Sequence, residues 1–144
     1  MSFHTIIIVG RLGRDPEMRY TSSGQAITSF SLATDRRYTD SSGQLQKQTF
    51  WFSISVFGKQ AESCNNYLKK GSMVVVEGNL RGDPNTGGPR VYPKSDGTSG
   101  ARYEVTAQTV RFLTPKGESQ DASAGGGGMS EETQDVAGGE DIPF

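Results

Sequence analysis

The clearest strand pattern in this chain covers nine residues, Thr49-Phe50-Trp51-Phe52-Ser53-Ile54-Ser55-Val56-Phe57. Its even positions are all apolar, whereas serines occupy two of its odd positions. Successive side chains of a strand point to opposite faces, so one of these sets faces the core and the other faces outward. The apolar even set predicts the core face, and Trp51 and Phe57 are therefore expected on the outer face.

Strand-like segments on both sides of this stretch predict a small all-β domain. They are rich in β-branched and aromatic residues, and turn residues separate them. The expected strands are residues 3–12 (with a bulge or bend at Gly10), 17–21, 26–34, 72–80 and 101–113. Within the polar segment 35–48, Asp40-Ser41-Ser42-Gly43 predicts a hairpin tip. Residues 82–100 are so rich in glycine and proline that they predict a long mobile loop. The two interpretations of this loop are a segment that closes over a bound strand and a plain mobile hairpin tip.

A change of hydrophobic period predicts one short helix within residues 59–70. Its apolar face carries Ala61, Cys64 and Leu68. Lys69 and Lys70 are expected in the last turn, where cations complement the helix dipole, and Gly71 is expected just after it. Curved strands with one helix between the third and fourth predict a five-stranded Greek-key barrel, the OB-fold.

The near-neutral total charge hides a basic body and an acidic tail. Residues 1–114 carry fourteen lysines and arginines against nine acids, a net charge of +5. Residues 115–144 carry one lysine against seven acids, a net charge of −6. The basic body indicates a polyanionic partner. The tail is dominated by Gly, Ser and acidic residues and cannot bury enough apolar surface to fold, so residues 115–139 are expected to be a disordered linker.

The last five residues join two carboxylates to a compact apolar end: Glu140, Asp141, Ile142, Pro143 and Phe144. Such a group fits an apolar pocket with a basic rim on another protein. We therefore expect residues 140–144 to be a docking tip for protein partners. The alternative is an ordinary frayed acidic terminus. The opposite charges of the two parts also predict that the tail competes weakly for the basic surface of the body.

Cations alternate with aromatic residues around the central strand. Exposed rings on a sheet stack with nucleic-acid bases, worth about 1–3 kcal/mol per base, and cations neutralise phosphates. This composition is typical of a groove for a nucleic-acid single strand. The candidate stacking residues are Trp51, Phe57, Tyr38 and Tyr92, and the candidate phosphate contacts are Lys59, Lys70, Arg36, Arg37, Arg81 and Arg90. The alternative for Trp51 and Phe57 is packing under a loop or inside a subunit interface.

Signatures of catalysis are missing from the sequence. One histidine, His4, and one cysteine, Cys64, leave no set for a metal site or a nucleophile–base pair. We therefore expect no metal, no cofactor and no enzymatic activity, and we expect Cys64 to be a small core residue. The single cysteine suits a reducing compartment, and no leader or membrane-spanning segment is visible, so a cytoplasmic location is expected.

Several ordered motifs resemble those of bacterial single-stranded DNA-binding proteins. They are residues 9–20 (VGRLGRDPEMRY), 30–34 (FSLAT), 51–59 (from Trp51 to Phe57-Gly58-Lys59), 67–71 (YLKKG) and 76–81 (VEGNLR), and the acidic end resembles the family's tip. The resemblance implies an OB-fold in residues 1–114 that forms a homotetramer and binds single-stranded DNA without sequence preference. It also implies recruitment of replication, recombination and repair proteins through the tip. Trp51, Phe57 and Tyr38 fall on the family's stacking positions, and Lys59 and Lys70 fall on its phosphate-contact positions.

Two other classes of protein remain compatible with the sequence. One is an RNA-binding OB-fold protein, against which the acidic docking tip argues. The other is a protein-interaction or assembly module in which Trp51 and Phe57 lie inside a subunit interface. Replacing both residues with alanine would then break assembly instead of DNA binding.

Overall fold

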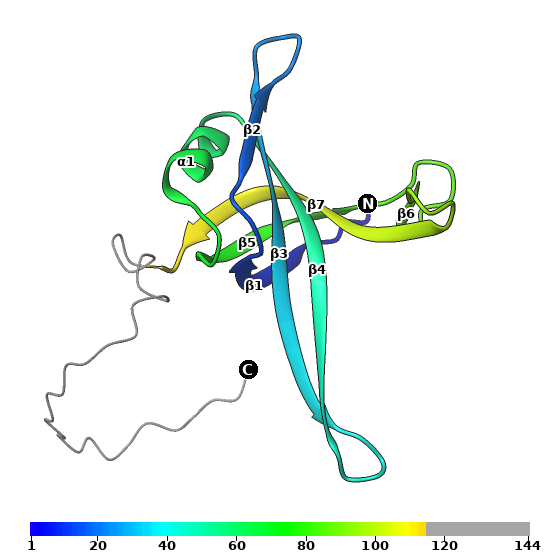
Figure 1. Cartoon of the computed structure of the whole chain (residues 1–144). Coiled ribbons are helices and arrows are strands. Elements are labelled where there is room, and N and C mark those ends of the chain that lie inside the picture. The colour runs from blue at the N-terminus through cyan, green and yellow to red at the C-terminus, as the bar shows by residue number, and fades with distance from the viewer. Residues whose placement is uncertain (115–144) are drawn as a thin grey trace, which may run out of the picture.

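The computed structural model of the chain describes residues 1–114 and consists mostly of strands (Figure 1). The expected linker, residues 115–139, and the expected tip, residues 140–144, lie outside the described residues. In chain order the elements are β1 (Ile6–Leu12), β2 (Glu17–Tyr20), β3 (Ala26–Thr39), β4 (Leu45–Phe57), α1 (Lys59–Tyr67), β5 (Met73–Arg81), β6 (Arg90–Pro93) and β7 (Ser99–Phe112).

Five of these strands close into a barrel. The pairing order is β1-β5-β7-β4-β3, and pairs Arg11↔Ala33 and Leu12↔Leu32 join β3 back to β1. The β4–β7 pair is parallel, whereas the other pairs of the ring are antiparallel. The single helix follows β4, the third barrel strand, and precedes β5, the fourth. The predicted five-stranded OB-fold is therefore confirmed.

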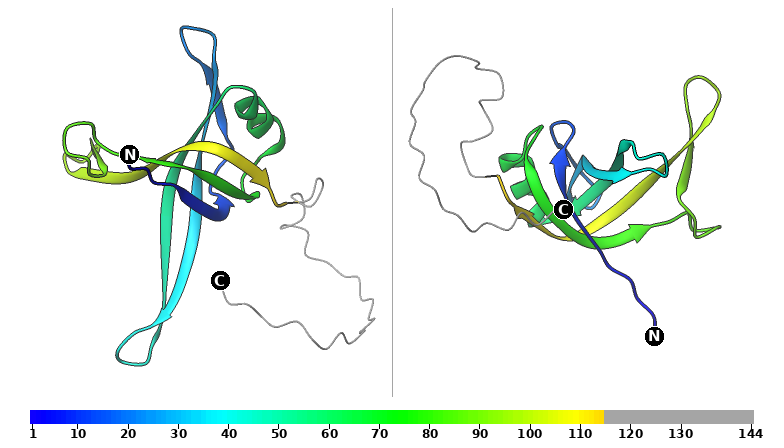
Figure 2. Two further views of the ribbon diagram at one scale, coloured as in Figure 1. Left: turned by 180° about the vertical axis from the view of Figure 1, so that it is seen from behind. Right: turned by 90° about the horizontal axis from the view of Figure 1, so that it is seen from below.

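The core fills the barrel and continues under α1, at one end of the barrel (Figures 1 and 2). Its fully covered side chains come from every barrel strand and from the helix, and include Leu12, Phe30, Leu32, Ile54, Val56, Val74, Val76, Val105, Ala61 and Cys64. The buried hydroxyl of Thr28 on β3 donates a hydrogen bond to the carbonyl oxygen of Ala61 at 2.6 Å and so ties the helix to the barrel. The predicted core role of Cys64 is confirmed.

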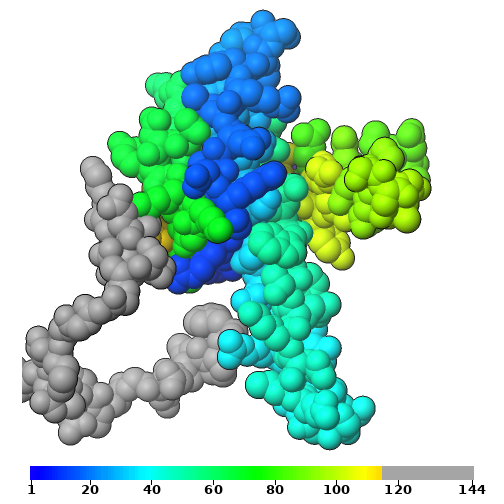
Figure 3. Space-filling model, viewed as in Figure 1, coloured from blue at the N-terminus to red at the C-terminus, as the bar shows by residue number. Residues whose placement is uncertain are grey.

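Three hairpins leave the barrel in different directions (Figures 1 and 3). One is formed by β2 and the start of β3, and the other two are called the long and the short hairpin. The long hairpin is formed by β3 and β4, which pair over thirteen positions from Ile27↔Phe57 to Thr39↔Leu45. The short hairpin is formed by β6 and the first part of β7, which pair over four positions from Arg90↔Arg102 to Pro93↔Ser99. The surface between the long and the short hairpin contains the candidate functional site.

Two of the predicted boundaries are wrong in an informative way. Residues 82–100 do not form a featureless loop, because β6 and the start of β7 lie within them. The long hairpin extends through most of the polar segment 35–48, since β3 continues to Thr39 and β4 begins at Leu45. In both places backbone pairing forms a strand where the side chains give no apolar alternation. The predicted tip at Asp40-Ser41-Ser42-Gly43 is confirmed.

The helix and the first strand also differ from the prediction. Helix α1 ends at Tyr67, with Leu68 already extended, so Lys69 and Lys70 follow the helix and do not complement its dipole. The first strand begins at Ile6, and its pairing with β5 runs evenly through Gly10, with no bulge there. Glycine is required at that position because a Cβ atom would collide with the carbonyl oxygen of Ala33.

Candidate nucleic-acid interface

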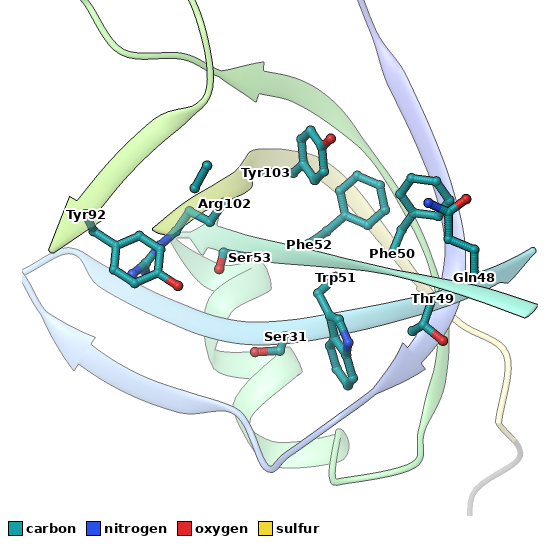
Figure 4. Close-up of a pocket in the computed structure, with 11 residues that line it drawn as sticks. Ser31, Gln48, Thr49, Phe50, Trp51, Phe52, Ser53, Tyr92, Arg102 and Tyr103 are labelled. Atoms are coloured by element: carbon teal, nitrogen blue, oxygen red, sulfur yellow. The ribbon is translucent and has the colours of Figure 1, made fainter. Parts of the chain in front are cut away.

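A groove opens where β4 and β7 separate. The two strands pair only from Phe52↔Tyr103 to Ser55↔Thr106, and before this segment they diverge into the long and the short hairpin. The groove has a volume of about 450 Å³ and is shown in Figure 4. Its lining comes from β3, β4, β6 and β7, and consists of Ser31, Gln48, Thr49, Phe50, Trp51, Phe52, Ser53, Tyr92, Ala101, Arg102 and Tyr103.

Trp51 lies on the outer face of β4 and is 53% exposed, as the alternation of the strand predicted. Its cross-strand partner is the small residue Ala33. The indole ring lies against Gly13, where a Cβ atom would collide with the six-membered ring. The absence of a side chain at Gly13 therefore leaves room for the indole ring, which also lines the groove.

The even positions of β4 divide into two pairs. Ile54 and Val56 are buried in the core, as predicted, with exposures of 1% and 0%. Phe50 and Phe52 are only half-buried and line the groove. Phe52 still packs against the core, so the predicted core face is wrong for Phe50. The reason is the divergence of β7, which no longer covers β4 before residue 52.

Tyr103 adds a further ring to this part of the groove. It lies beside Phe52 with the ring centroids 5.8 Å apart and the planes tilted by 40°. Its side chain is 48% exposed, which is unusual for a large aromatic residue next to a core. Trp51, Phe52 and Tyr103 together give the groove the ring surface that a stacking platform needs.

Tyr92 brings an aromatic ring from the short hairpin to the same groove. It pairs with Gly100 on β7, where a Cβ atom would lie 2.7 Å from the ring carbon Cζ, so glycine leaves the space that the ring occupies. The guanidinium of Arg102 lies over this ring, 4.1 Å from its centroid, as a cation–π contact. The sequence-predicted residues Trp51 and Tyr92 thus line one groove from two hairpins (Figure 4).

Charged residues gather at the base of the short hairpin. Glu104 on β7 forms ion pairs with Arg90, between Nε and Oε2 at 3.4 Å, and with Arg102, between Nε and Oε1 at 3.9 Å. Arg81 on β5 is the direct cross-strand partner of Glu104. A second groove of about 460 Å³ lies beside this cluster, and Arg81, Arg102 and Tyr103 are part of its lining. Arg102 and Tyr103 line both grooves and connect them.

Other predicted contacts lie away from these two grooves. On the long hairpin, Arg36 lies 5.3 Å from the ring centroid of Tyr38, which is 41% exposed, and Arg37 pairs with Lys47 across the strands. Phe57, Lys59 and Lys70 line neither groove. Phe57 is half-buried opposite Ile27, and Lys59 begins α1. Lys70 lies in the loop after α1, where its backbone amide donates a hydrogen bond to Asp15 Oδ1 at 2.8 Å.

Sequence reasoning missed Arg102 and Tyr103 as site residues. Both lie within the predicted final strand, where they were assigned no role. The available signal was the adjacent cation and aromatic ring, the same combination that drew attention to Arg37 and Tyr38. What the sequence did not contain was the position at which β7 leaves β4.

Other kinds of site find little support among residues 1–114. No three His, Cys, Asp or Glu side chains of this part gather closely enough to hold a metal ion. In the same part of the chain, no helix is long and apolar enough to cross a membrane. Burial of the Cys64 thiol raises its pKa to about 12, so this cysteine stays protonated inside the core at neutral pH.

A closed five-stranded barrel with one helix between its third and fourth strands defines the OB-fold class of proteins, and here it carries a groove lined by aromatic rings and Arg102. The model of the Single-strand binding protein family matches residues 3–113 of this chain. The chain therefore belongs to this family, and the resemblance noted from the sequence motifs is confirmed.

Characterised relatives agree with this assignment. The chain is 37% identical over 118 residues to the single-stranded DNA-binding protein of Neisseria meningitidis serogroup A, a match covering 82% of this chain and 64% of that relative's length. It is 35% identical over 160 residues to single-stranded DNA-binding protein 1 of Chlorobaculum tepidum, covering 96% of both chains. Among solved structures, a Plasmodium falciparum SSB complex with ssDNA matches at a TM-score of 0.65 and 25% identity, covering 79% of this chain and 97% of that chain.

Proposed function

We propose that this protein binds single-stranded DNA without sequence preference and has no enzymatic activity. The observation that carries the proposal is the groove between the two hairpins. It offers ring faces from Trp51, Phe52, Tyr92 and Tyr103 together with the cation Arg102. Every base has a π-face, so ring stacking tolerates any sequence, and arginine neutralises phosphates.

The proposed path of the DNA strand is longer than the groove. The second groove continues it over Arg102 and Tyr103 toward Arg81, and the long hairpin extends it in the other direction with Arg36, Arg37 and Tyr38. Lys59, Lys70 and Phe57 would contact only a strand that continues around the barrel. Binding should weaken as salt rises, because each neutralised phosphate on a single strand releases about 0.7 counterion.

The proposed assembly is a homotetramer, as the family resemblance implies. One feature of β1 supports contacts between copies. Ile7 and Val9 are 65% and 53% exposed on a strand whose pairing with β3 covers only Arg11 and Leu12. An exposed apolar strand with a free backbone edge is the kind of surface that a second copy covers.

Recruitment of protein partners is the remaining part of the proposal. Residues 140–144 would dock replication, recombination and repair proteins, while residues 115–139 link this tip to the barrel. The charge of the sequence supports this division, because the acids of the tip attract a basic protein surface and repel the phosphates of DNA. Deleting residues 140–144 should abolish partner capture and leave DNA affinity intact.

The test of DNA binding uses Trp51, the only tryptophan of the chain, as the probe. Titration with a long oligo-dT should quench its fluorescence strongly at low salt and less at high salt. Trp51→Ala should weaken binding by about 5- to 150-fold in anisotropy with a labelled oligonucleotide, which corresponds to about 1–3 kcal/mol for one stacked base. Tyr20→Ala is the matched control, because Tyr20 is 61% exposed on β2 and lines neither groove.

Two outcomes would count against the proposal. Binding that leaves the emission unchanged, together with full affinity of Trp51→Ala, would remove Trp51 from the DNA site. No binding at all, with a subunit assembly that Trp51→Ala breaks in analytical ultracentrifugation, would show an interaction module instead. A matched oligo-rU titration separates DNA from RNA binding, and tighter binding to rU would overturn the choice of DNA.

A further inference from the structure

Glu104 is an acidic side chain that lies next to arginines of three strands. Its ion pairs reach Arg90 on β6 and Arg102 on β7, and it is the cross-strand partner of Arg81 on β5. Arg90 and Arg102 are themselves direct partners in the antiparallel β6–β7 ladder, where like charges repel. Glu104 offsets that repulsion in the protein without ligand.

The geometry of Arg102 suits a contact with DNA. Its side chain is exposed, its guanidinium lies over the Tyr92 ring, and it belongs to the lining of both grooves. A strand that passes from one groove to the other therefore crosses this side chain. Guanidinium groups bind phosphate through two parallel hydrogen bonds and can stack with a base at the same time.

The ion pairs of Glu104 are of the kind that a phosphate can replace. At 3.4 and 3.9 Å they are long, and the side chains of Arg90 and Arg102 are 45% and 44% exposed. Exposed ion pairs contribute little to stability and are weakened by salt. The other nearby acid, Asp83, accepts hydrogen bonds from the backbone amides of Asn85 and Thr86 at 2.8 and 3.3 Å and is held in its own turn.

We propose that Arg102 is a further DNA-contact residue and that Glu104 is its internal counter-ion, which a DNA phosphate displaces on binding. The inference rests on the proposed binding of single-stranded DNA and adds the way in which the charge of the site is set. The cluster of Arg81, Arg90, Arg102 and Glu104 has a net charge of +2, and without the charge of Glu104 it would have a net charge of +3. Glu104 thus holds down affinity at low salt and keeps the short hairpin in position in the free protein.

The test compares Glu104→Gln with Glu62→Gln. Both changes remove one negative charge and keep the size of the side chain, but Glu62 is exposed on α1, away from both grooves. For Glu104→Gln, the plot of log affinity for oligo-dT against log salt should steepen by about 0.7. The ratio of variant to wild-type affinity should therefore grow about two- to threefold between 200 and 50 mM salt. Glu62→Gln should follow the wild type.

Arg102→Gln provides the second arm. It should lower affinity and make the salt slope shallower by about 0.7, and in this background the effect of Glu104→Gln should shrink. The double-variant cycle reports a functional link that a merely structural role would not produce. Should Glu104→Gln lose thermal stability, Arg102→Gln alone decides, and an unchanged salt slope overturns the proposal.

The possible results distinguish a failure of the Glu104 role from a failure of the proposed DNA binding. If the wild type binds oligo-dT and Trp51→Ala weakens it, while Glu104→Gln matches Glu62→Gln, only the role of Glu104 falls. If Glu104→Gln binds more weakly at every salt concentration with an unchanged slope, Glu104 acts only by holding the hairpin. If the wild type does not bind single-stranded DNA, the proposed function fails and this inference fails with it.

Discussion

The long and the short hairpin use the same turn but are held by different forces. In the long hairpin, the backbone amide of Asp40 donates to the carbonyl oxygen of Gln44, and the amide of Gly43 donates to that of Asp40. In the short hairpin, the amide of Lys94 donates to the carbonyl oxygen of Thr98, and the amide of Gly97 donates to that of Lys94. The two glycines have φ values of 83° and 86°, so both tips need a residue that tolerates the left-handed region. The two tips thus share their backbone hydrogen bonds and their glycine conformation, and the larger difference between the hairpins lies at their bases.

At its base the long hairpin is part of the core. Phe30, Leu32, Ile54 and Val56 come from its two strands, and none is more than 2% exposed. The short hairpin buries no comparable residue: Val91 is 66% exposed, and the base is held by the ion pairs of Glu104 and by Arg102 on Tyr92. The long hairpin therefore contributes to the stability of the barrel and also carries Trp51, whereas the short hairpin contributes little to that stability.

The largest expected effect is the difference in stability between truncating a residue at the base of the long hairpin and truncating one at its tip. Leu32→Ala should lower the free energy of unfolding by about 2–5 kcal/mol, because Leu32 is fully buried and its loss leaves a cavity. Leu45→Ala, at a position 71% exposed beside the tip, should change it by less than about 0.5 kcal/mol. Urea unfolding measures both values.

Val91→Ala on β6 is the matching change in the short hairpin. It should also stay within about 0.5 kcal/mol of the wild type, since Val91 is exposed. A loss as large as that of Leu32→Ala would mean that the short hairpin contributes to the stability of the barrel, and the division of roles would be wrong.

The second prediction concerns the ring that each hairpin contributes. On an oligo-dT just long enough to fill the groove at Trp51, Tyr92→Ala should lower affinity by about 1–3 kcal/mol, about 5- to 150-fold, because Tyr92 lines that groove. Tyr38→Ala should have no effect on this short ligand, since Tyr38 lies along the long hairpin outside the groove. Fluorescence anisotropy measures both.

A longer oligonucleotide sharpens the result. Once the strand reaches the long hairpin, Tyr38→Ala should also weaken binding. Equal losses for both variants on the short ligand would show that the two rings belong to one site, against the geometry of the groove.

The long hairpin could be predicted from the sequence better than the short one. The apolar even positions of residues 49–57 predicted the core strand, and Asp40 and Gly43 predicted the tip. The extension of β3 and β4 was missed because the side chains there are polar on both faces. Cross-strand contacts stabilise that part, such as the ion pair of Lys47 with Asp35 at 3.5 Å and the hydrogen bond from Thr49 to Asp35 at 2.7 Å.

The short hairpin was mistaken for a loop because composition outweighed local order. Its glycines serve particular positions: Gly97 forms the turn and Gly100 makes room for Tyr92. Asp96-Gly97, an established hairpin signal, was present in the sequence. Of the groove lining, Trp51 and Tyr92 were singled out from the sequence, but the places of Arg102 and Tyr103 depend on where two strands distant in sequence separate.

The smallest expected effect is a difference in the pH at which the two hairpin tips open. The Asp40 carboxylate accepts hydrogen bonds from the Ser42 hydroxyl at 2.6 Å, the amides of Gln44 and Ser42 at 2.9 and 3.0 Å, and the Gln46 side chain at 3.0 Å. These bonds, the Ser42 hydroxyl first, lower the pKa of Asp40 from 3.8 to about 2. In the short hairpin, bonds from the Thr98 hydroxyl and then the Thr98 amide lower the pKa of Asp96.

Both pKa values are lower in the folded chain, so each carboxylate stabilises its tip fully above its unfolded pKa and loses this contribution as pH falls through its folded pKa. The long tip should therefore persist until the pH approaches 2, and the short tip, with fewer bonds to its carboxylate, should open at a higher pH. An NMR titration that follows the amides of Gln44 and Thr98 measures the order. Asp40→Asn should abolish the transition at Gln44 and leave that at Thr98 unchanged, with no change in melting temperature at neutral pH. Simultaneous opening of the two tips would show that they report acid unfolding of the barrel, and the local origin of both shifts would be wrong.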